Sequence, residues 1–420
     1  MKLRMTILGS GKEIGRSAVL VEGNNSTFLF DYGVALGEKD EPKLPLSIAP
    51  SKLTALIITH AHLDHVGAAP LLYISGKVPA IMTPLTRDIS EIMIEDMLKI
   101  SGYYLPFEHL ELKNMLENTK PLGYYKELEM GSARIQLICS GHIPGSAMVK
   151  IIMGERSILY TGDVNTIDTR LVSSADLSNL EADTLIIEGT YGDVDHPERS
   201  LIEKKFIDTI IEILEDGGTI LIPAFSLGRS QEVLALLAEK LPYITVYYDG
   251  MVRRITEIML SYKDYLNKPN LLEKAVKLFE PVRGWDMRKK IWREPCVIVA
   301  PAGMLKGGPS LYYIKRLWSN RNNAIILVSF QAPGTPGRML IEEGTFMEKG
   351  PRITARLEWF DFSSHAGFSG LLKIVKCVRN LEKVIIVHSE EPSAKYLANR
   401  IREELGVDTY IPENGQVVEI

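Results

Sequence analysis

The residues of this chain best suited to chemistry lie at positions 60–65, which read His-Ala-His-Leu-Asp-His and place four potential metal ligands within six residues. The preceding run 53–59 is apolar and rich in β-branched side chains, which predicts a buried strand. The following run 66–72 suits the first turns of a helix. An extended backbone at the strand tip would point His60 and His62 to the same side, where one metal could bind both. Imidazoles grouped with a carboxylate favour a hydrolytic zinc site over a structural one.

Further polar side chains follow other predicted strands. Beyond the turn, Asp64 and His65 are placed to serve a second metal, and a predicted hairpin ends at Asp31. The remaining strand-end residues are His142, Asp163, Glu188, His365 and His388. Binding and catalytic residues are often carried by the loops of a rigid scaffold, so we expect this set to converge. The other two histidines, His109 and His196, are expected to be ordinary surface residues.

Three segments differ in their predicted architecture, and 420 residues exceed what one core needs, so we expect two domains. Residues 1–199 contain short strands, hairpins and helical patterns, which predicts stacked sheets covered by helices. Residues 200–356 alternate continuous apolar strands with helices, which predicts an α/β domain whose parallel sheet is covered on both faces. Residues 357–420 return to strands that end in polar residues.

Three loops of the middle segment, at 223–229, 302–309 and 331–338, each follow a predicted strand. Open α/β sheets bind ligands at this end of their strands. Turn chemistry explains the glycines and prolines of these loops. It does not explain the hydroxyl and cationic side chains that recur there, namely Ser226, Arg229, Lys306 and Arg338.

The segment 283–293 reads RGWDMRKKIWR and interleaves Trp285 and Trp292 with cations. Aromatic and cationic side chains together suit single-stranded nucleic acid, because bases stack on the rings while the phosphates are neutralised. An amphipathic helix with one solvated face explains the same pattern and is the reading that we favour from the sequence.

Composition narrows the class of protein. A hydrophobic content of 45% is ordinary for a globular chain, and no apolar run reaches the length of a membrane span or a signal peptide. The cysteines, Cys139, Cys296 and Cys377, are odd in number and widely spaced, which favours a reducing compartment, so we expect a cytoplasmic protein. A net charge of −5 means that an anionic substrate must be held by a local site.

Taken together, the motifs resemble those of the β-CASP branch of metallo-β-lactamase nucleases, over essentially the whole chain. The matching residues are Asp31, the 60–65 motif, His142, Asp163, Glu188 in EGTYG, His365 in SSHAG, His388 in VHSE and the three loops. Departures from the commonest forms ESTYG, SAHAD and VHGE occur at Gly189, Ser364, Gly367 and Ser389. The resemblance is strongest to archaeal and bacterial relatives of the cleavage and polyadenylation specificity factor nuclease, in a short form without KH domains.

The resemblance implies a metallo-β-lactamase αββα sandwich made of residues 1–199 and 357–420, with a β-CASP domain inserted at 200–356. It implies two Zn²⁺ ions per chain. One would be bound by His60, His62 and His142, the other by Asp64, His65 and His388, and Asp163 would bridge them, while Asp31 supports the ligand histidines.

The resemblance further implies hydrolysis of phosphodiester bonds in single-stranded RNA by a metal-activated water. His365, oriented by Glu188, would protonate the leaving oxygen, and Asp64 belongs to the catalytic set as well as to the ligands. Ser226, Arg229 and Ser363 would contact the RNA. Members that act on DNA usually carry valine where this chain has His388, which favours RNA.

Several alternatives stay open at this stage. We favour an endonuclease over a 5′–3′ exonuclease of the RNase J kind. A scaffold without activity is less favoured because every ligand position is retained, and a small-ester hydrolase is less favoured because of the 157-residue insertion, counted from 200 to 356. The sequence also leaves a homodimer open.

Overall fold

The computed structural model describes residues 3–36, 41–101 and 104–420. The chain divides into two compact units. The first comprises Met1–Asp168, Ser174–Asp195 and Ser364–Ile420, and the second comprises Thr169–Ser173 and His196–Ser363. The second unit is thus longer at both ends than the expected 200–356 insertion. One reason is that β19 (Arg356–Trp359) pairs in parallel with β18 (Ala324–Leu327) and extends the sheet of that unit.

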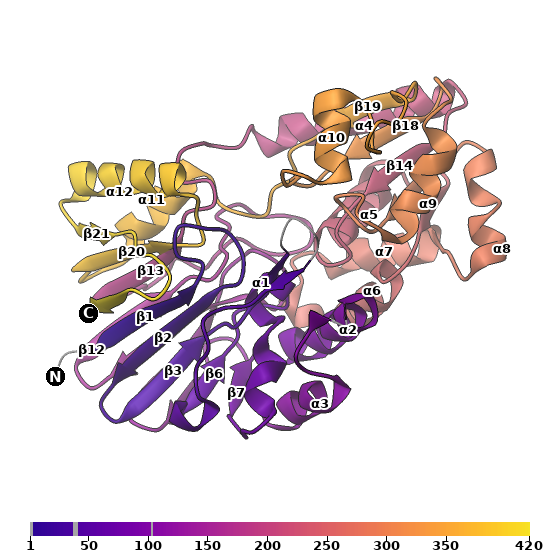
Figure 1. The fold of residues 1–420 in the computed structure, drawn as a ribbon. Coiled ribbons are helices and arrows are strands. Elements are labelled where there is room, and N and C mark those ends of the chain that lie inside the picture. The colour runs from indigo at the N-terminus through magenta and orange to yellow at the C-terminus, as the bar shows by residue number, and fades with distance from the viewer. Residues whose placement is uncertain (1–2, 37–40, 102–103) are drawn as a thin grey trace. The chain divides into compact units, whose positions relative to one another are not determined.

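Within the described residues, the first unit contains two seven-stranded sheets (Figure 1). The first, in the order β22-β1-β2-β3-β6-β7-β8, is built from β1 (Arg4–Gly9), β2 (Ala18–Gly23), β3 (Ser26–Phe30), β6 (Ala55–Ile57), β7 (Ala80–Met82), β8 (Thr119–Pro121) and β22 (Val417–Glu419). The second, in the order β21-β20-β13-β12-β11-β10-β9, is built from β9 (Glu127–Met130), β10 (Ala133–Cys139), β11 (Ala147–Met153), β12 (Arg156–Tyr160), β13 (Thr184–Glu188), β20 (Lys383–Val387) and β21 (Asp408–Tyr410). A small ribbon joins β4 (Ala35–Leu36) to β5 (Pro42–Lys43).

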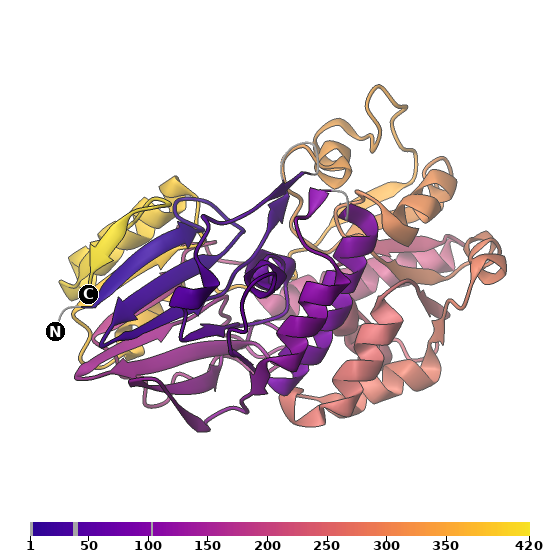
Figure 2. The same ribbon diagram turned by 60° about the horizontal axis from the view of Figure 1, so that its bottom comes forward.

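The two sheets pack face to face, because alternate residues of both are apolar and buried in one common core. Ile7 and Phe28 of the first sheet share this core with Ile135 and Val149 of the second. Helices cover the outer faces: α2 (Pro84–Ser101) and α3 (His109–Glu117) on the first sheet, α11 (Phe368–Cys377) and α12 (Glu391–Leu405) on the second. The yellow C-terminal helices lie over their sheet in both views (Figure 1 and Figure 2). The predicted αββα sandwich is confirmed.

The C-terminal segment completes both sheets of the first unit. Its strand β20 pairs in parallel with β13, and its last strand β22 pairs antiparallel with β1. The residues that follow the insertion are therefore part of the sandwich itself, and they return His365 and His388 to it.

The second unit holds a six-stranded sheet in the order β16-β15-β17-β14-β18-β19, and every pairing in it among the described residues is parallel. Its other strands are β14 (Ile220–Pro223), β15 (Val246–Tyr248), β16 (Glu280–Pro281) and β17 (Val297–Ala300). Helices α4 (Arg199–Glu215), α5 (Arg229–Lys240), α6 (Val252–Ser261) and α7 (Pro269–Leu278) cover one face, while α9 (Gly308–Leu317) and α10 (Pro336–Glu343) cover the other. The predicted parallel sheet covered on both faces is confirmed.

The helix expected at 66–72 is wrong in detail. The structure has a single turn, α1 (Leu63–Val66), followed by a 3-10 segment at Ala69–Tyr73. The reason is Pro70, which has no N–H to donate to the carbonyl of Val66 and so cannot continue an α-helix.

In the described ranges, no helix combines the length and the apolar character that crossing a bilayer requires. The three cysteines are free thiols, as the sequence predicted.

Candidate metal centre

Adjacent strand ends bring the candidate residues together within the first unit. In the second sheet, β12, β13 and β20 are parallel neighbours, so their carboxyl ends meet at one edge. Asp163, Glu188 and His388 lie at or just beyond these three ends. His142 follows β10 of the same sheet, and the 60–65 motif follows β6 of the other sheet.

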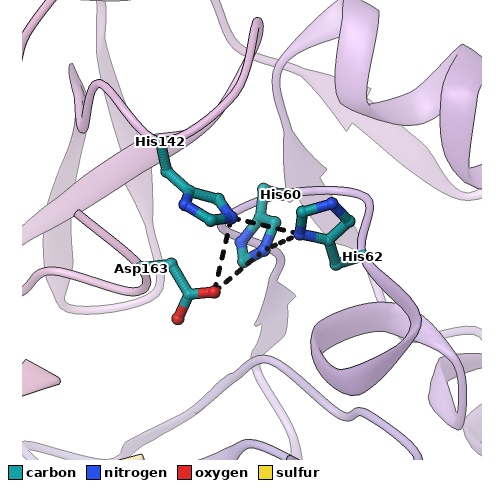
Figure 3. Close-up of side chains that lie close together, drawn as sticks. All are labelled: His60, His62, His142 and Asp163. Atoms are coloured by element: carbon teal, nitrogen blue, oxygen red, sulfur yellow. Dashed lines mark hydrogen bonds and ion pairs between the residues drawn. The ribbon is translucent and has the colours of Figure 1, made fainter. Parts of the chain in front are cut away.

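Four side chains form the first cluster, shown in Figure 3 with their donor atoms turned toward one another. His62 Nδ1 lies 3.1 Å from His60 Nε2 and 3.1 Å from His142 Nε2. Asp163 Oδ2 lies 3.4 Å from His60 Nε2 and 3.5 Å from His142 Nε2. These atoms come from both sheets of the sandwich.

The spacing of this cluster fits a tetrahedral metal ion. Metal–nitrogen bonds of about 2.1 Å around a tetrahedral ion place neighbouring donors about 3.4 Å apart. The four separations above, 3.1 to 3.5 Å, match that value. The donor set of three imidazoles and one carboxylate is also typical of a zinc site.

Asp64, His65 and His388 form a second cluster beside the first. His388 Nε2 lies 3.3 Å from Asp64 Oδ2, and His65 Nε2 lies 3.2 Å from Asp163 Oδ1. Asp163 therefore turns one oxygen toward each cluster. Its Oδ1 is buried and makes no hydrogen bond with any described group. A buried carboxylate oxygen without a hydrogen bond is costly unless a cation satisfies it, and here that cation is either the protonated His65 ring or a second metal in its place.

Hydrogen bonds on the far side of the rings decide which nitrogen faces the clusters. Asp31 is fully buried and accepts from His65 Nδ1 at 2.7 Å, which leaves Nε2 for Asp163. The carbonyl of Ser364 accepts from His142 Nδ1 at 2.9 Å. The hydroxyl of Thr59 lies 3.1 Å from His60 Nδ1 and donates to Asp31. Such outer partners fix the tautomer and orientation of ligand histidines.

The backbone is also held in uncommon conformations at this edge. His388 has a φ of 48° and Asp31 a φ of 57°. Few residues other than glycine adopt this left-handed region, and those that do are concentrated at functional sites. The N–H of His388 donates to the carbonyl of Ser10 at 2.9 Å, which secures the conformation.

Charge and burial prepare the rings for a cation. Burial, with the neighbouring imidazoles, holds the pKa of His60 and of His142 well below its ordinary value, so both rings are neutral and keep a lone pair. Burial alone would lower the pKa of His65, but the carboxylates of Asp163 and Asp31 raise it well above its ordinary range. Because neutral imidazole is the form that binds metal, a cation must displace a proton from His65.

His365 is held differently from the other histidines. Its Nδ1 lies 3.0 and 2.9 Å from the two carboxylate oxygens of Glu188, and its Nε2 lies 3.8 Å from Asp163 Oδ2. Its side chain is 21% exposed, whereas that of Glu188 is 1% exposed. Burial lowers the pKa of His365, but the charges of Glu188 and Asp163 outweigh it and raise this pKa to about 9. The ring is therefore in its charged imidazolium form at neutral pH, and it faces the clusters.

Thr190 connects this pair to the second cluster. Its hydroxyl donates to Glu188 and lies 3.2 Å from His388 Nδ1. Thr190 is not among the residues predicted from the sequence. Nor are Thr59 and Tyr160, and the Tyr160 hydroxyl donates to Asp31 at 3.0 Å. Their position in the sequence could have identified two of them. Thr59 and Tyr160 are polar residues at the tips of apolar strands, and they closely precede His60 and Asp163.

Two of the departures from the common motifs compensate each other. A Cβ built on Gly189 would lie 2.8 Å from Ile386 Cγ2 and 2.9 Å from Ser389 Oγ. Glycine and serine have thus exchanged places between the two motifs, since Ser389 fills the space that a serine at 189 would need. The Ser389 hydroxyl donates to the Gly189 carbonyl at 2.7 Å.

The residues expected to contact substrate belong to the second unit, whereas both clusters belong to the first. Asp361 brings two of them together. The N–H of Ser363 donates to Asp361 Oδ1 at 2.9 Å. Burial raises the pKa of Asp361, whereas the hydrogen bond from His196 lowers it. The charge of Arg229, at the start of α5, lowers it further, so that this pKa falls below its ordinary value. Ser226 is held separately, through a bond from the Gln231 side chain to its carbonyl.

His109 is exposed, as expected, but the same expectation for His196 is wrong. The His196 side chain is 18% exposed and its Nδ1 donates to Asp361 Oδ2 at 2.7 Å.

Known proteins match the chain throughout. Family profiles match residues 11–224 (metallo-beta-lactamase superfamily), 230–340 (Beta-Casp domain) and 350–412 (Zn-dependent metallo-hydrolase RNA specificity domain). A Saccharolobus solfataricus protein named RNase aCSPSF2 is 47% identical, covering 100% of this chain and 86% of that protein. Probable RNase MJ4 of Methanocaldococcus jannaschii is 38% identical, covering 98% and 99%. Transcription termination factor FttA of Pyrococcus abyssi is 35% identical, covering 98% and 70%.

A solved structure of a protein of unknown function from Enterococcus faecalis V583 has the same fold, with a TM-score of 0.61 at 15% identity and full coverage of both chains. The motifs, the paired clusters, the family profiles and the full-length relatives agree. The chain belongs to the metallo-β-lactamase superfamily, in its β-CASP branch, and is a metal-dependent hydrolase.

Proposed function

We propose that the chain is a ribonuclease that holds two Zn²⁺ ions and hydrolyses phosphodiester bonds of single-stranded RNA. The observation that carries this proposal is Asp163, whose two oxygens face two clusters of nitrogen and oxygen donors. Relatives that match the whole chain and are named RNases support RNA as the substrate.

His60, His62 and His142 would hold one zinc, Asp64, His65 and His388 the other, and Asp163 would touch both. Two such ions, when bound, would lower the pKa of water to about 7 and neutralise charge on the phosphate. The protein itself keeps the six other donors at fixed spacing, and Asp31 and Thr59 keep the imidazoles in the tautomers that this requires.

His365 acts as the general acid. Glu188 occupies its Nδ1, so the transferable proton is on Nε2, on the side of Asp163. The water loses a proton to solvent, the resulting hydroxide forms a bond to phosphorus, the P–O3′ bond breaks, and the leaving oxygen takes the proton from His365. The products are a 5′-phosphate and a 3′-hydroxyl. General acids of this kind accelerate reactions by about 10²–10⁴.

The second unit contributes substrate contacts. Arg229 neutralises a phosphate, and Ser226 and Ser363 donate hydrogen bonds to the RNA backbone. Because attack by water does not use the 2′-hydroxyl, the preference for RNA over DNA arises from binding contacts to that group. The favoured mode of cleavage is endonucleolytic. A 5′–3′ exonuclease activity is the second candidate, since a relative named RNase J-like protein is 33% identical over 98% of this chain.

The deciding assay uses zinc-loaded protein and one RNA labelled at either end, carrying a 5′-hydroxyl or a 5′-monophosphate. An endonuclease yields complementary fragments from the two labels, which map to the same internal sites whichever 5′ group the RNA carries. If mononucleotides were released only from RNA with a 5′-monophosphate end, the protein would be a 5′–3′ exonuclease and not an endonuclease. Equal cleavage rates on the matched DNA strand would contradict the RNA preference, and fully zinc-loaded protein that cleaves nothing would contradict the enzyme itself.

A further inference from the structure

The segment 283–293 is placed by the structure in a way that separates its two tryptophans. Trp292 packs partly buried against the core on one face of the second unit's sheet. Trp285, in α8 (Trp285–Arg288), is 57% exposed. An ordinary amphipathic helix turns its aromatic side chains inward and its cations outward. Trp292 follows that rule and Trp285 does not.

Trp285 belongs to a row of alternating rings and guanidinium groups. The Arg288 guanidinium lies 4.8 Å from the Trp285 ring centre, and the Trp285 and Tyr312 ring centres are 5.4 Å apart. Arg316 covers the Tyr312 ring at 3.4 Å. We name these four residues, Trp285, Arg288, Tyr312 and Arg316, the aromatic platform. Its members come from α8 and α9.

Buried residues of the second unit hold the Arg288 side chain of the platform. Arg288 makes a bidentate ion pair with Asp249, at 2.7 and 2.6 Å, and the Tyr313 hydroxyl donates to the same carboxylate at 2.7 Å. Asp249 is 1% exposed, and Tyr313 is completely buried. Bidentate pairs of this kind restrict geometry strongly, so the Arg288 guanidinium is held in position beside the Trp285 ring.

Cations are concentrated in the segment that carries the exposed ring and on α9. Residues 283–293 hold five cations and a single acid, Asp286, in a chain whose net charge is −5. The cations that are exposed here or on the neighbouring α9 are Arg283, Lys289, Lys290, Arg293, Lys315 and Arg316. In the described part of the chain none of these six forms a salt bridge with a carboxylate. The local charge is thus available to a polyanion.

The strand order connects this surface with the three loops. All strands of the sheet are parallel, so β16, which precedes 283–293, ends at the same edge as β17, β14 and β18. The loops along that edge are joined, since the Gln331 side chain donates to the Gly303 carbonyl at 3.0 Å and the Gly337 N–H donates to the Met304 carbonyl at 3.1 Å. From β16 to β14 is three strand spacings, or about 14 Å.

We propose that the aromatic platform is a stacking site for bases of single-stranded RNA, extending the substrate contacts of the second unit along the carboxyl edge of its sheet. An exposed indole beside a guanidinium group accepts any base, while the exposed lysines and arginines of the same segment and of α9 follow the phosphates. This inference rests on the proposed function, because it takes RNA as the substrate. It adds a contact that only an RNA long enough to reach the platform can make.

The test compares steady-state kinetics of full-length, zinc-loaded wild type and Trp285→Ala on two single-stranded RNAs, one of roughly 20 nucleotides and one a dinucleotide, which is too short to span about 14 Å. For the long RNA, Trp285→Ala raises KM about tenfold and leaves kcat unchanged. For the short RNA, both constants stay as in wild type. Trp285→Tyr restores most of the affinity, because the phenol ring still stacks.

Two controls match the substitutions. Tyr243→Ala removes an aromatic residue that is 75% exposed and precedes β15, at the opposite edge of the same sheet, and leaves KM unchanged. Lys289→Glu with Lys290→Glu raises KM for the long RNA and lessens its salt dependence, whereas Lys204→Glu with Lys205→Glu, on α4, does not.

An unchanged KM for the long RNA in both Trp285→Ala and the 289/290 double variant overturns the inference, and leaves a protein partner as the occupant of this surface. An equal rise of KM in Tyr243→Ala overturns it as well, since the effect would then not be local. Failure of the proposed function looks different, because wild type itself would cleave neither RNA.

Discussion

The two sheet edges that carry polar residues in this chain are built on different principles. At the edge in the first unit, carboxylates and imidazoles are buried and joined by hydrogen bonds, as in the pairs Asp31–His65 and Glu188–His365. At the edge in the second unit, loops are joined by amide and backbone contacts, and cations remain exposed. The first arrangement holds nitrogen and oxygen donors at spacings that suit a metal, and the second leaves positive charge exposed.

This difference predicts how substitutions divide. Changes in the first unit should affect metal content and kcat, because they alter groups that touch the reacting atoms. Changes in the second unit should affect KM and its salt dependence, because they alter contacts made by the ground state and the transition state alike. A variant of the first unit that changed only KM, or a variant of the second unit that changed kcat or metal content, would contradict this difference between the units.

The largest effect is expected for Asp163→Ala. Loss of the residue shared by both clusters removes at least one of the two metals and lowers activity by roughly a thousandfold or more. Metal analysis of the purified protein together with RNA cleavage measures both. Asp408→Ala, an exposed carboxylate at the start of β21, is the matched control and keeps metal and activity. An Asp163→Ala protein with two metals and normal turnover would contradict the assignment.

The next effect is expected for His365→Ala, which keeps both metals and binds RNA but is slower by about 10²–10⁴ in kcat. A substrate with a 3′-thiolate leaving group needs no proton and recovers part of this loss. His109→Ala, an exposed histidine of the first unit, leaves kcat unchanged. Wild-type turnover in a fully metallated His365→Ala protein would exclude the role as acid.

A pH profile of Glu188→Gln sharpens the same assignment. The carboxylate charges raise the pKa of His365 to about 9 in spite of its burial, so removing the charge of Glu188 lowers this pKa. His365 then loses its acidic proton at a lower pH, so the alkaline limb of the kcat profile shifts to lower pH. Glutamine still offers an oxygen to the N–H of Val164, which Glu188 Oε1 binds at 2.8 Å. An unmoved limb would show that another group limits the rate.

A smaller effect belongs to the second unit. Arg229→Ala should raise KM for RNA by roughly tenfold and make the salt dependence of KM shallower, because one phosphate contact is lost. Metal content and kcat should not change. Arg321→Ala, at an exposed position before β18 and thus at the amino edge of the sheet, is the control. A fall in kcat at constant KM would place Arg229 with the catalytic groups and break the division between the units.

The smallest effect concerns the exchanged glycine and serine. Gly189→Ser crowds Ser389 and should lower the free energy of unfolding by about 1–3 kcal/mol, since the space is already filled. The double variant Gly189→Ser with Ser389→Gly restores the common motifs and should recover most of that loss. Denaturant unfolding of the wild type, both single variants and the double variant measures the coupling. Additive losses would mean that the two positions are independent.

Part of the fold and of the candidate site could be predicted because the information is local. The 60–65 motif lies on one strand end and one turn, so its spacing alone brings His60 and His62 to one side. Strand and helix periods predicted both the stacked sheets and the parallel sheet of the second unit. Pro70 is a counterexample, because a continuous helical pattern was expected across a residue that cannot continue the helix.

The remaining features depend on contacts between residues far apart in the chain, which no local pattern encodes. The meeting of Asp163 with His388 follows from the adjacency of β12, β13 and β20. The bridge made by Thr190, and the burial of His196 against Asp361, also arise from such pairings. The sequence pattern treats Trp285 and Trp292 alike, and only the packing of the second unit leaves Trp285 exposed beside Tyr312 and Trp292 partly buried. Residue types and spacing thus determined which chemistry this chain can do, whereas the tertiary structure decided which side chains share a neighbour, because burial is a property of the whole core.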